Sequence, residues 1–103
     1  MVGAKRTYYS TKFAIDFVGG ELGNLPKDAR VEPVITASRG TVEAVAVRPL
    51  AQVKGYRVVF DLKPTDEDVT PFELRVHLKR DGRALTESWL YQWTPPPVSQ
   101  RKF

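Results

Sequence analysis

The chain has no cysteine and only one histidine, and these two absences remove several classes of function. Without cysteine there is no disulfide scaffold, no thiolate metal site and no cysteine nucleophile. One histidine cannot build a histidine-rich metal centre. His77 is expected on the charged face of a strand, between Arg75 and Lys79, where a solvated imidazole is a better interpretation than a general base. The sequence therefore predicts no metal, no cofactor and no histidine-based catalysis.

Long apolar runs are also absent. No stretch approaches the roughly 20 apolar residues of a membrane-spanning helix, so no membrane insertion is expected. The first ten residues, MVGAKRTYYS, lack the apolar region of a secretory signal, so the chain is interpreted either as cytosolic or as a mature piece of something longer. Its 103 residues are expected to form one domain whose core needs no disulfide.

Positive charge is in excess, but it is not gathered in one place. The net charge of +4 raises the hypothesis of nucleic-acid binding. Lys5, Arg6, Arg101 and Lys102 lie near the two ends, and without them 12 basic residues balance 12 acidic ones. Phosphate contacts require a basic stripe, which the sequence does not have, so no nucleic-acid partner is expected.

Apolar and polar residues alternate along most of the chain, as they do in half-buried strands. The alternation predicts strands over residues 12–18, 31–38, 41–49, 56–63, 72–79 and 83–93. Pro33 indicates an edge strand or a bulge. Helical periodicity is missing, and at most a turn or two of helix is expected within residues 20–29. The predicted fold class is an all-β, antiparallel β-sandwich of six or seven strands.

The two flanks of the chain do not share this alternation. Residues 1–11 are predicted to be an N-terminal linker or tail, and residues 12–94 the sandwich domain. Residues 95–103 are predicted to be a C-terminal tail that begins with a stiff run of three prolines, residues 95–97.

Two motifs suggest a ligand site or catalysis, and neither has the required spacing. The sequence GGELG follows a strand as a phosphate-binding loop would, but Pro26 prevents the helix whose N-terminus would hold the phosphate. Asp66, Glu67 and Asp68 lack the alternating ligands of a calcium loop. Three adjacent acids also do not supply the two carboxylates, about 5–10 Å apart across a cleft, of a glycosidase. The acidic loop is interpreted as solubilising, and the chain alone is predicted not to be an enzyme.

The sequence ESWLYQW, residues 87–93, places Trp89, Tyr91 and Trp93 on one face of a strand. Such a row is either one wall of the core or a platform for stacking sugar rings. We favour the core, because the opposite face is small and mostly polar and aromatic rings usually carry core burial. Trp93, nearest the tail, is the one of the three expected to be partly exposed. The aromatic residues that could contact carbohydrate or a partner are Trp93, Tyr56, Tyr8 and Tyr9.

Four stretches of the chain resemble one protein family. FAIDFVGGELGNLP, VEPVITASRGTV, YRVVFDLKP and ELRVHLKRDGRALTESWLYQW, in this order, resemble the C-terminal end of the periplasmic glucans biosynthesis proteins, the MdoG/OpgG and OpgD family. The resemblance covers nearly all of residues 12–93. DFVGG and the closing ESW and YQW are its most specific pieces. It implies a small immunoglobulin-like sandwich of about seven strands, C-terminal to a large domain. The large domain carries the glucan cleft and the catalytic acids.

The resemblance implies a non-catalytic accessory domain of a periplasmic protein that helps to make osmoregulated glucans with β-1,2-linked backbones. Such a domain would pack on the large glucan-cleft domain and offer a surface for glucan-synthesis partners or self-association. The alternative is a carbohydrate-binding module that contacts β-1,2-glucan through exposed aromatics. A standalone adhesion-type sandwich is a third hypothesis, and it would need exposed strand edges.

Overall fold

The fold was determined as a computed structural model, which describes residues 9–26, 29–50 and 52–101. Short 3-10 helices η1 (Gly20–Asn24) and η2 (Val98–Gln100) accompany the strands. The strands are β1 (Thr11–Val18), β2 (Glu32–Ala37), β3 (Thr41–Leu50), β4 (Gly55–Lys63), β5 (Phe72–Arg80), β6 (Arg83–Ala84) and β7 (Trp89–Trp93). Within the described residues, no helix has the length and apolar character needed to cross a bilayer.

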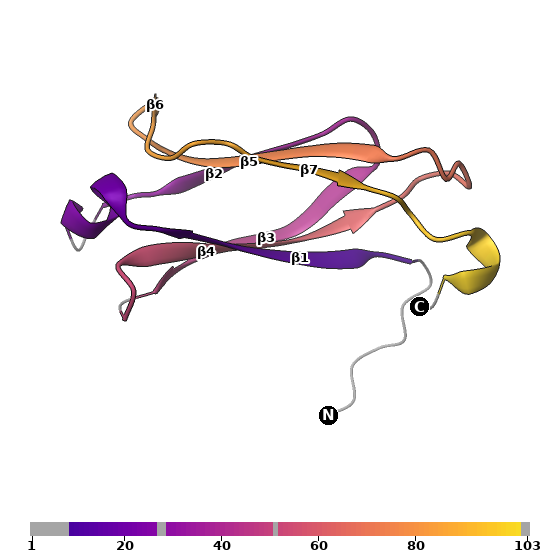
Figure 1. Cartoon of the computed structure of the whole chain (residues 1–103), viewed down its shortest axis with the longest axis horizontal. Helices are drawn as coiled ribbons and strands as arrows, with labels where there is room; N and C mark the ends of the chain where they lie inside the picture. Colours follow the sequence, from indigo (N-terminus) through magenta and orange to yellow (C-terminus); the bar gives the residue numbers. More distant parts are fainter. Residues whose placement is uncertain (1–8, 27–28, 51, 102–103) are drawn as a thin grey trace.

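The strands form two antiparallel sheets that lie face to face (Figure 1). One sheet has the order β1-β4-β3, and in the other β5 pairs with β2 on one side and with β6 and β7 on the other. If β1, β2, β3, β4, β5 and β7 are equated with immunoglobulin strands B, C, D, E, F and G, these orders become B-E-D and C-F-G. The predicted all-β, immunoglobulin-like sandwich is confirmed.

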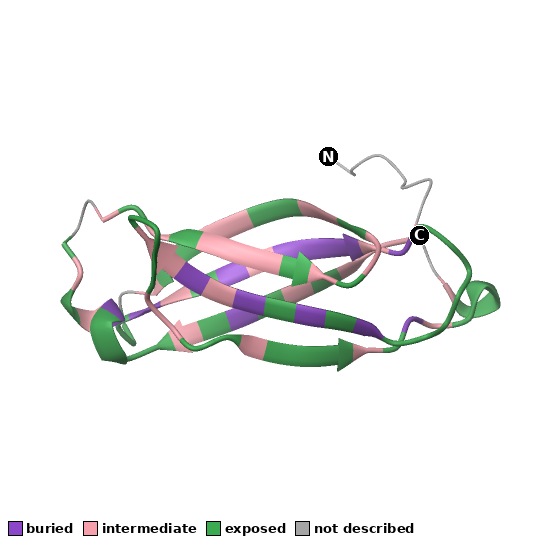
Figure 2. Ribbon diagram, turned by 90° about the horizontal axis from the view of Figure 1, so that it is seen from above, coloured by how far each residue is buried: buried purple, intermediate pink, exposed green. Residues whose placement is uncertain are grey.

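The core lies between the two central strands, β4 and β5 (Figure 2). In β5 the buried residues alternate with exposed or half-buried ones, whereas β4 is more deeply covered and Asp61 on its outer face is buried too. The apolar side chains that the alternation places inward are buried as predicted. They are Val58, Phe60 and Leu62 of β4 and Phe72, Leu74, Val76 and Leu78 of β5, none more than 2% exposed. Burying such a side chain stabilises a fold by about 1.5–3 kcal/mol. These two strands therefore contribute most of the core.

Two smaller predictions are also confirmed. Residues 20–29 contain η1, which ends at Asn24. The next residue, Leu25, has the extended backbone that a following proline favours. Pro33 lies on β2, an edge strand, where its missing N–H group costs no ladder hydrogen bond.

The last strand is not continuous as predicted. The alternation predicts one strand over residues 83–93, whereas residues 85–88 separate β6 from β7. The N–H group of Leu85 donates to the Leu78 carbonyl oxygen over 2.8 Å, and the N–H group of Leu78 donates to Thr86 Oγ1 over 3.0 Å. A side-chain oxygen thus takes the place of a main-chain acceptor beside β5, and the strand is interrupted there.

His77 is more covered than the sequence predicts. Its side chain is half-buried, and its Nδ1 atom is shielded from solvent. The prediction of a solvated imidazole is wrong because β5 is the central strand of its sheet. The edge strand β2 places Val34 directly opposite His77, so the two side chains are neighbours on the same face of the sheet.

One end of the sandwich is held together by an arginine. Arg39, in the turn between β2 and β3, donates to a carboxylate oxygen of Asp66 over 3.3 Å and to the main-chain oxygens of Asp68 and Thr70. Its guanidinium lies 4.2 Å from the centre of the Phe72 ring, within cation–π range. The acidic loop predicted to be solubilising is therefore also a structural binding partner.

The two ends of the described chain meet at the same place. Arg101 donates to the carbonyl oxygens of Pro96, over 2.9 Å, and Asp66, over 3.1 Å, and lies 5.7 Å from the centre of the Tyr9 ring. Pro95 is fully buried. We call this region the terminal end; it comprises Tyr9, Arg39, residues 64–71 and residues 95–101. The predicted domain boundaries stay predictions, but the packed structure extends through Arg101.

Truncation of a central core residue tests the position of the core. Phe60 is fully buried and stacks on Phe13 with ring centres 5.3 Å apart. We expect Phe60→Ala to lower the free energy of unfolding by about 3–5 kcal/mol, because it loses burial and leaves a cavity. Urea denaturation followed by circular dichroism measures this. Leu90→Ala is the matched control, since Leu90 is 64% exposed, and should change stability by less than about 0.5 kcal/mol. Equal effects of the two variants would place the core elsewhere.

Acid should weaken the terminal end. The pKa of the Asp68 carboxyl lies below its usual value, chiefly because the Thr70 hydroxyl donates to it over 2.6 Å and secondarily because the Thr70 N–H group does so too. A carboxyl with a depressed folded pKa stabilises the fold above its unfolded pKa, and this contribution is lost as the pH falls through the folded value. We therefore expect the free energy of unfolding to decline below about pH 4.

The variant Asp68→Asn keeps an acceptor oxygen but cannot titrate, so its stability should decline less steeply than that of the native chain in urea denaturation between about pH 6 and pH 3. Glu67→Gln, a change at the exposed neighbouring acid, serves as the control and should leave the acid dependence unchanged. An unaltered pH profile in Asp68→Asn would contradict the role of this carboxylate.

Candidate functional site

The aromatic residues expected to contact carbohydrate or a partner do not form a common site. Tyr8 lies outside the described residues. Tyr9 is at the terminal end, where its hydroxyl oxygen lies 2.6 Å from Thr11 Oγ1. Tyr56 is the second residue of β4, at the opposite end, where it pairs with Phe17 of β1 and packs half-buried against the core.

Trp93 packs against the core and does not face solvent as a platform. It is half-buried on the inner face of β7 and meets two rings edge-on, Phe13 at 5.9 Å and Phe72 at 5.3 Å between ring centres. Trp93 is partly exposed, as expected, but Tyr91 is more exposed, at 47%. β7 is an edge strand, and its last residue lies between a ring of each sheet.

Trp89 and Tyr91 lie along an opening between the two sheets. Their rings stack with centres 5.2 Å apart and planes 20° apart. Tyr91 also meets Phe13 of β1 edge-on at 6.2 Å. β1 and β7 are edge strands of different sheets, so this contact brings the two edges to the same side of the sandwich. We call this side, between β1 and residues 85–93, the open seam.

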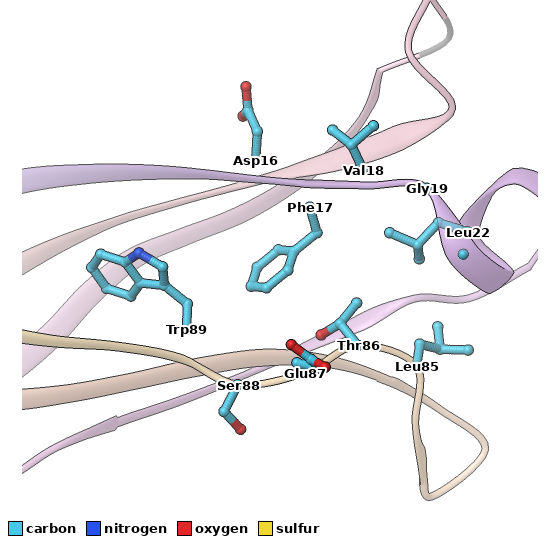
Figure 3. Close-up of a pocket in the computed structure, with 11 residues that line it drawn as sticks. Asp16, Phe17, Val18, Gly19, Leu22, Leu85, Thr86, Glu87, Ser88 and Trp89 are labelled. Atoms are coloured by element: carbon cyan, nitrogen blue, oxygen red, sulfur yellow. The ribbon is translucent and has the colours of Figure 1, made fainter.

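A cavity of about 510 Å³ lies at the open seam, away from the terminal end. It is lined by residues 16–20, Leu22 and residues 85–89. In Figure 3 the rings of Phe17 and Trp89 point into the same space from opposite strands, while Asp16 and Val18 point to the outer side of β1. Glu87 and Thr86 lie on the β7 side of this space.

A glycine turn shapes one wall of the cavity, and a hydrogen bond between strands shapes the other. Gly19 and Gly20 have φ values of 86° and 57°, in the left-handed region that favours glycine. They end β1 abruptly and turn the chain into η1, which places Leu22 in the core beside the cavity. On the other wall, the hydrogen bond from Leu78 to Thr86 draws the chain out of the strand before it re-forms at Trp89.

Two carboxylates line the cavity, and they differ in whether an arginine of the chain binds them. Asp16 is bound by Arg57, with Nε 2.7 Å from Oδ1 and Nη2 3.0 Å from Oδ2. The hydrogen bonding of Arg57 lowers the pKa of Asp16, so this carboxylate remains ionised and compensated on the outer face of the sheet. Glu87 is exposed and adds a carboxylate on the cavity side. The described residues contain no group of three or more potential metal-ligating side chains placed to hold an ion.

Sequence reasoning did not select Phe17, Glu87 or the cavity itself. The family resemblance nevertheless contained a signal for this site. DFVGG and ESW, two of the most specific pieces of the family resemblance, are far apart in the chain and line the same cavity from opposite sides. They meet because β1 and β7 are edge strands of different sheets on the same side of the sandwich. Alternation alone does not reveal which strands lie at the edges.

Comparison with known proteins gives a consistent result. Residues 1–93 match the family described as periplasmic glucan biosynthesis protein, MdoG. Over 99% of its length the chain is 55% identical to glucans biosynthesis protein D of Xanthomonas campestris pv. campestris and 52% identical to a probable glucans biosynthesis protein D of Shewanella oneidensis. Over 95% of its length it is 50% identical to glucans biosynthesis protein D of Stenotrophomonas maltophilia.

The chain spans about a fifth of the length of these curated relatives, 20%, 19% and 18% respectively. The family match covers most of the chain, and the relatives share half of its residues or more. The chain therefore belongs to the MdoG family of periplasmic glucan biosynthesis proteins, as the resemblance in its sequence implies.

Proposed function

We propose that the chain is a non-catalytic accessory domain of a periplasmic protein of glucan biosynthesis. It packs through its terminal end on the large domain that makes up the remainder of its relatives, and it offers a surface for partners or self-association. The observation that carries this proposal is the network at the terminal end, where Arg39 and Arg101 hold one loop against the first and last described residues.

The terminal end has the properties of a docking platform. The loop of residues 64–71 is fixed by contacts from the β2–β3 turn and from the C-terminal segment, so its surface is pre-organised. β1 begins at this end, and the resemblance places the large domain before this strand. A short connection would bring the large domain against this end.

The acids with described contacts support a structural role. Asp16 is bound by Arg57, and Asp66 and Asp68 are bound by Arg39 and, for Asp68, by Thr70. Each carboxylate binds an arginine or accepts a hydrogen bond within its loop, and such contacts stabilise the fold. The relatives are about five times as long as the chain and have ample length for a catalytic centre elsewhere.

Catalysis is tested with the purified chain and β-1,2-linked glucan. We expect no new reducing ends above the buffer control, because Asp16, Asp66 and Asp68 are engaged in structural contacts. Glu87 alone does not supply the two carboxylates that a glycosidase needs. Release of reducing ends that is abolished by one Asp→Asn or Glu→Gln substitution would overturn the non-catalytic assignment.

Docking is tested by adding the remainder of the Xanthomonas campestris relative, without the segment that matches this chain, to the isotope-labelled chain. We expect amide shifts at Arg39, residues 64–71 and Arg101. Glu67→Arg, which adds bulk and reverses charge on the terminal end, should reduce affinity at least about tenfold, or 1.4 kcal/mol. Asp81→Arg, a matched change at the opposite end, should not reduce it. Shifts confined to the open seam would overturn the proposed docking face.

A further inference from the structure

The cavity at the open seam has the size and the walls of a small-ligand site. Its volume of about 510 Å³ lies within the roughly 300–1,000 Å³ of such pockets. Phe17 and Trp89 supply aromatic walls from the two different sheets (Figure 3). Tyr91, stacked on Trp89 and 47% exposed, continues the aromatic surface along β7 beyond the cavity. The apolar part of the site is thus longer than the cavity itself.

The polar part of the lining selects for hydroxyl groups. The Glu87 carboxylate accepts hydrogen bonds and donates none while it is ionised. Thr86 Oγ1 already accepts the Leu78 N–H group, so its own hydrogen is free to be donated to a ligand. Arg57 is the cation bound to Asp16, and it is committed to that carboxylate on the outer side of β1. The lining therefore disfavours phosphates and other anions and favours a neutral ligand that donates from hydroxyls.

A pyranose ring has this complementary chemistry, because its faces carry C–H groups that pack on aromatic rings and its rim carries hydroxyls. From the lining we infer that the open seam binds a neutral glucan chain. One sugar ring lies between Phe17 and Trp89 with its hydroxyls at Glu87, and the chain continues over Tyr91. This site goes beyond the docking role, because it uses residues away from the terminal end, and it differs from the Trp93, Tyr56, Tyr8 and Tyr9 contacts expected from the sequence.

Two tryptophans make the test specific, because one is in the cavity and the other is in the core. The isotope-labelled 103-residue chain is titrated with a β-1,2-linked glucose oligosaccharide, to about 10 mM so that even millimolar binding approaches saturation. We expect the indole N–H signal of Trp89, and amides of residues 16–20 and 85–89, to shift, while the indole signal of Trp93 stays in place. Inorganic phosphate at the same concentration should leave the Trp89 signal unmoved.

Glu87→Gln keeps the shape of the side chain and removes its charge, and we expect it to weaken oligosaccharide binding at least fivefold. Trp89→Phe keeps an aromatic ring in the core contact but shortens the wall, and it should weaken binding as much or more. Glu67→Gln at the terminal end is the matched control and should bind as the native chain does. Circular dichroism of each variant verifies that the fold is kept.

Three results would overturn the inference. They are a Trp89 signal that does not move with the oligosaccharide, a Glu87→Gln variant with native affinity, and shifts confined to the terminal end. None of these results bears on docking, which is measured with the relative's large domain and no sugar. Failure of the glucan site and failure of the docking role are therefore distinguishable.

Discussion

The contact between the inner faces of β4 and β5 is the constraint on which the rest of the structure depends. Seven apolar side chains from these two strands are almost fully buried, and each sheet is built outward from one of them. With the core concentrated in the centre, the edge strands are free to carry other chemistry. β2 accommodates a proline, β3 a bulge between Glu43 and Ala46, and β7 a row of partly exposed rings.

The sequence was most informative for the two central strands, which have a neighbouring strand on each side. Alternation in residues 56–63, broken only by Val59, and strict alternation in residues 72–79 predicted both central strands and their inward residues. A one-residue slip in either strand would expose the whole core face. The sequence was less informative at edges. Trp89, Tyr91 and Trp93 share one face of the edge strand β7, yet Tyr91 is 47% exposed while the other two rings are half-buried. Alternation places the three rings on one face but does not rank their exposure.

The candidate site depended on information that local pattern does not contain. The break before β7 arises from the Thr86 hydroxyl bonding to Leu78, a tertiary contact that alternation cannot reveal. Similarly, the acidic loop could be recognised as a loop, but its partner Arg39 lies in a turn about 30 residues earlier. Family resemblance supplied the missing information in part, since two of its most specific pieces, DFVGG and ESW, are the ones that meet at the cavity.

The closeness of Tyr9 and Arg101 has a consequence for the covalent topology of the domain. The Arg101 guanidinium lies 5.7 Å from the Tyr9 ring centre, so the two backbones are at most about two side-chain lengths apart, and a loop of several residues could join them at a modest cost in chain entropy. The chain could then be circularly permuted by joining these two positions and opening it at the exposed Asp81–Gly82 turn. Because each sheet is held by pairing and not by chain order, such a circular permutant would retain both sheets and present new ends on the far side of the molecule, leaving the terminal end as a closed surface.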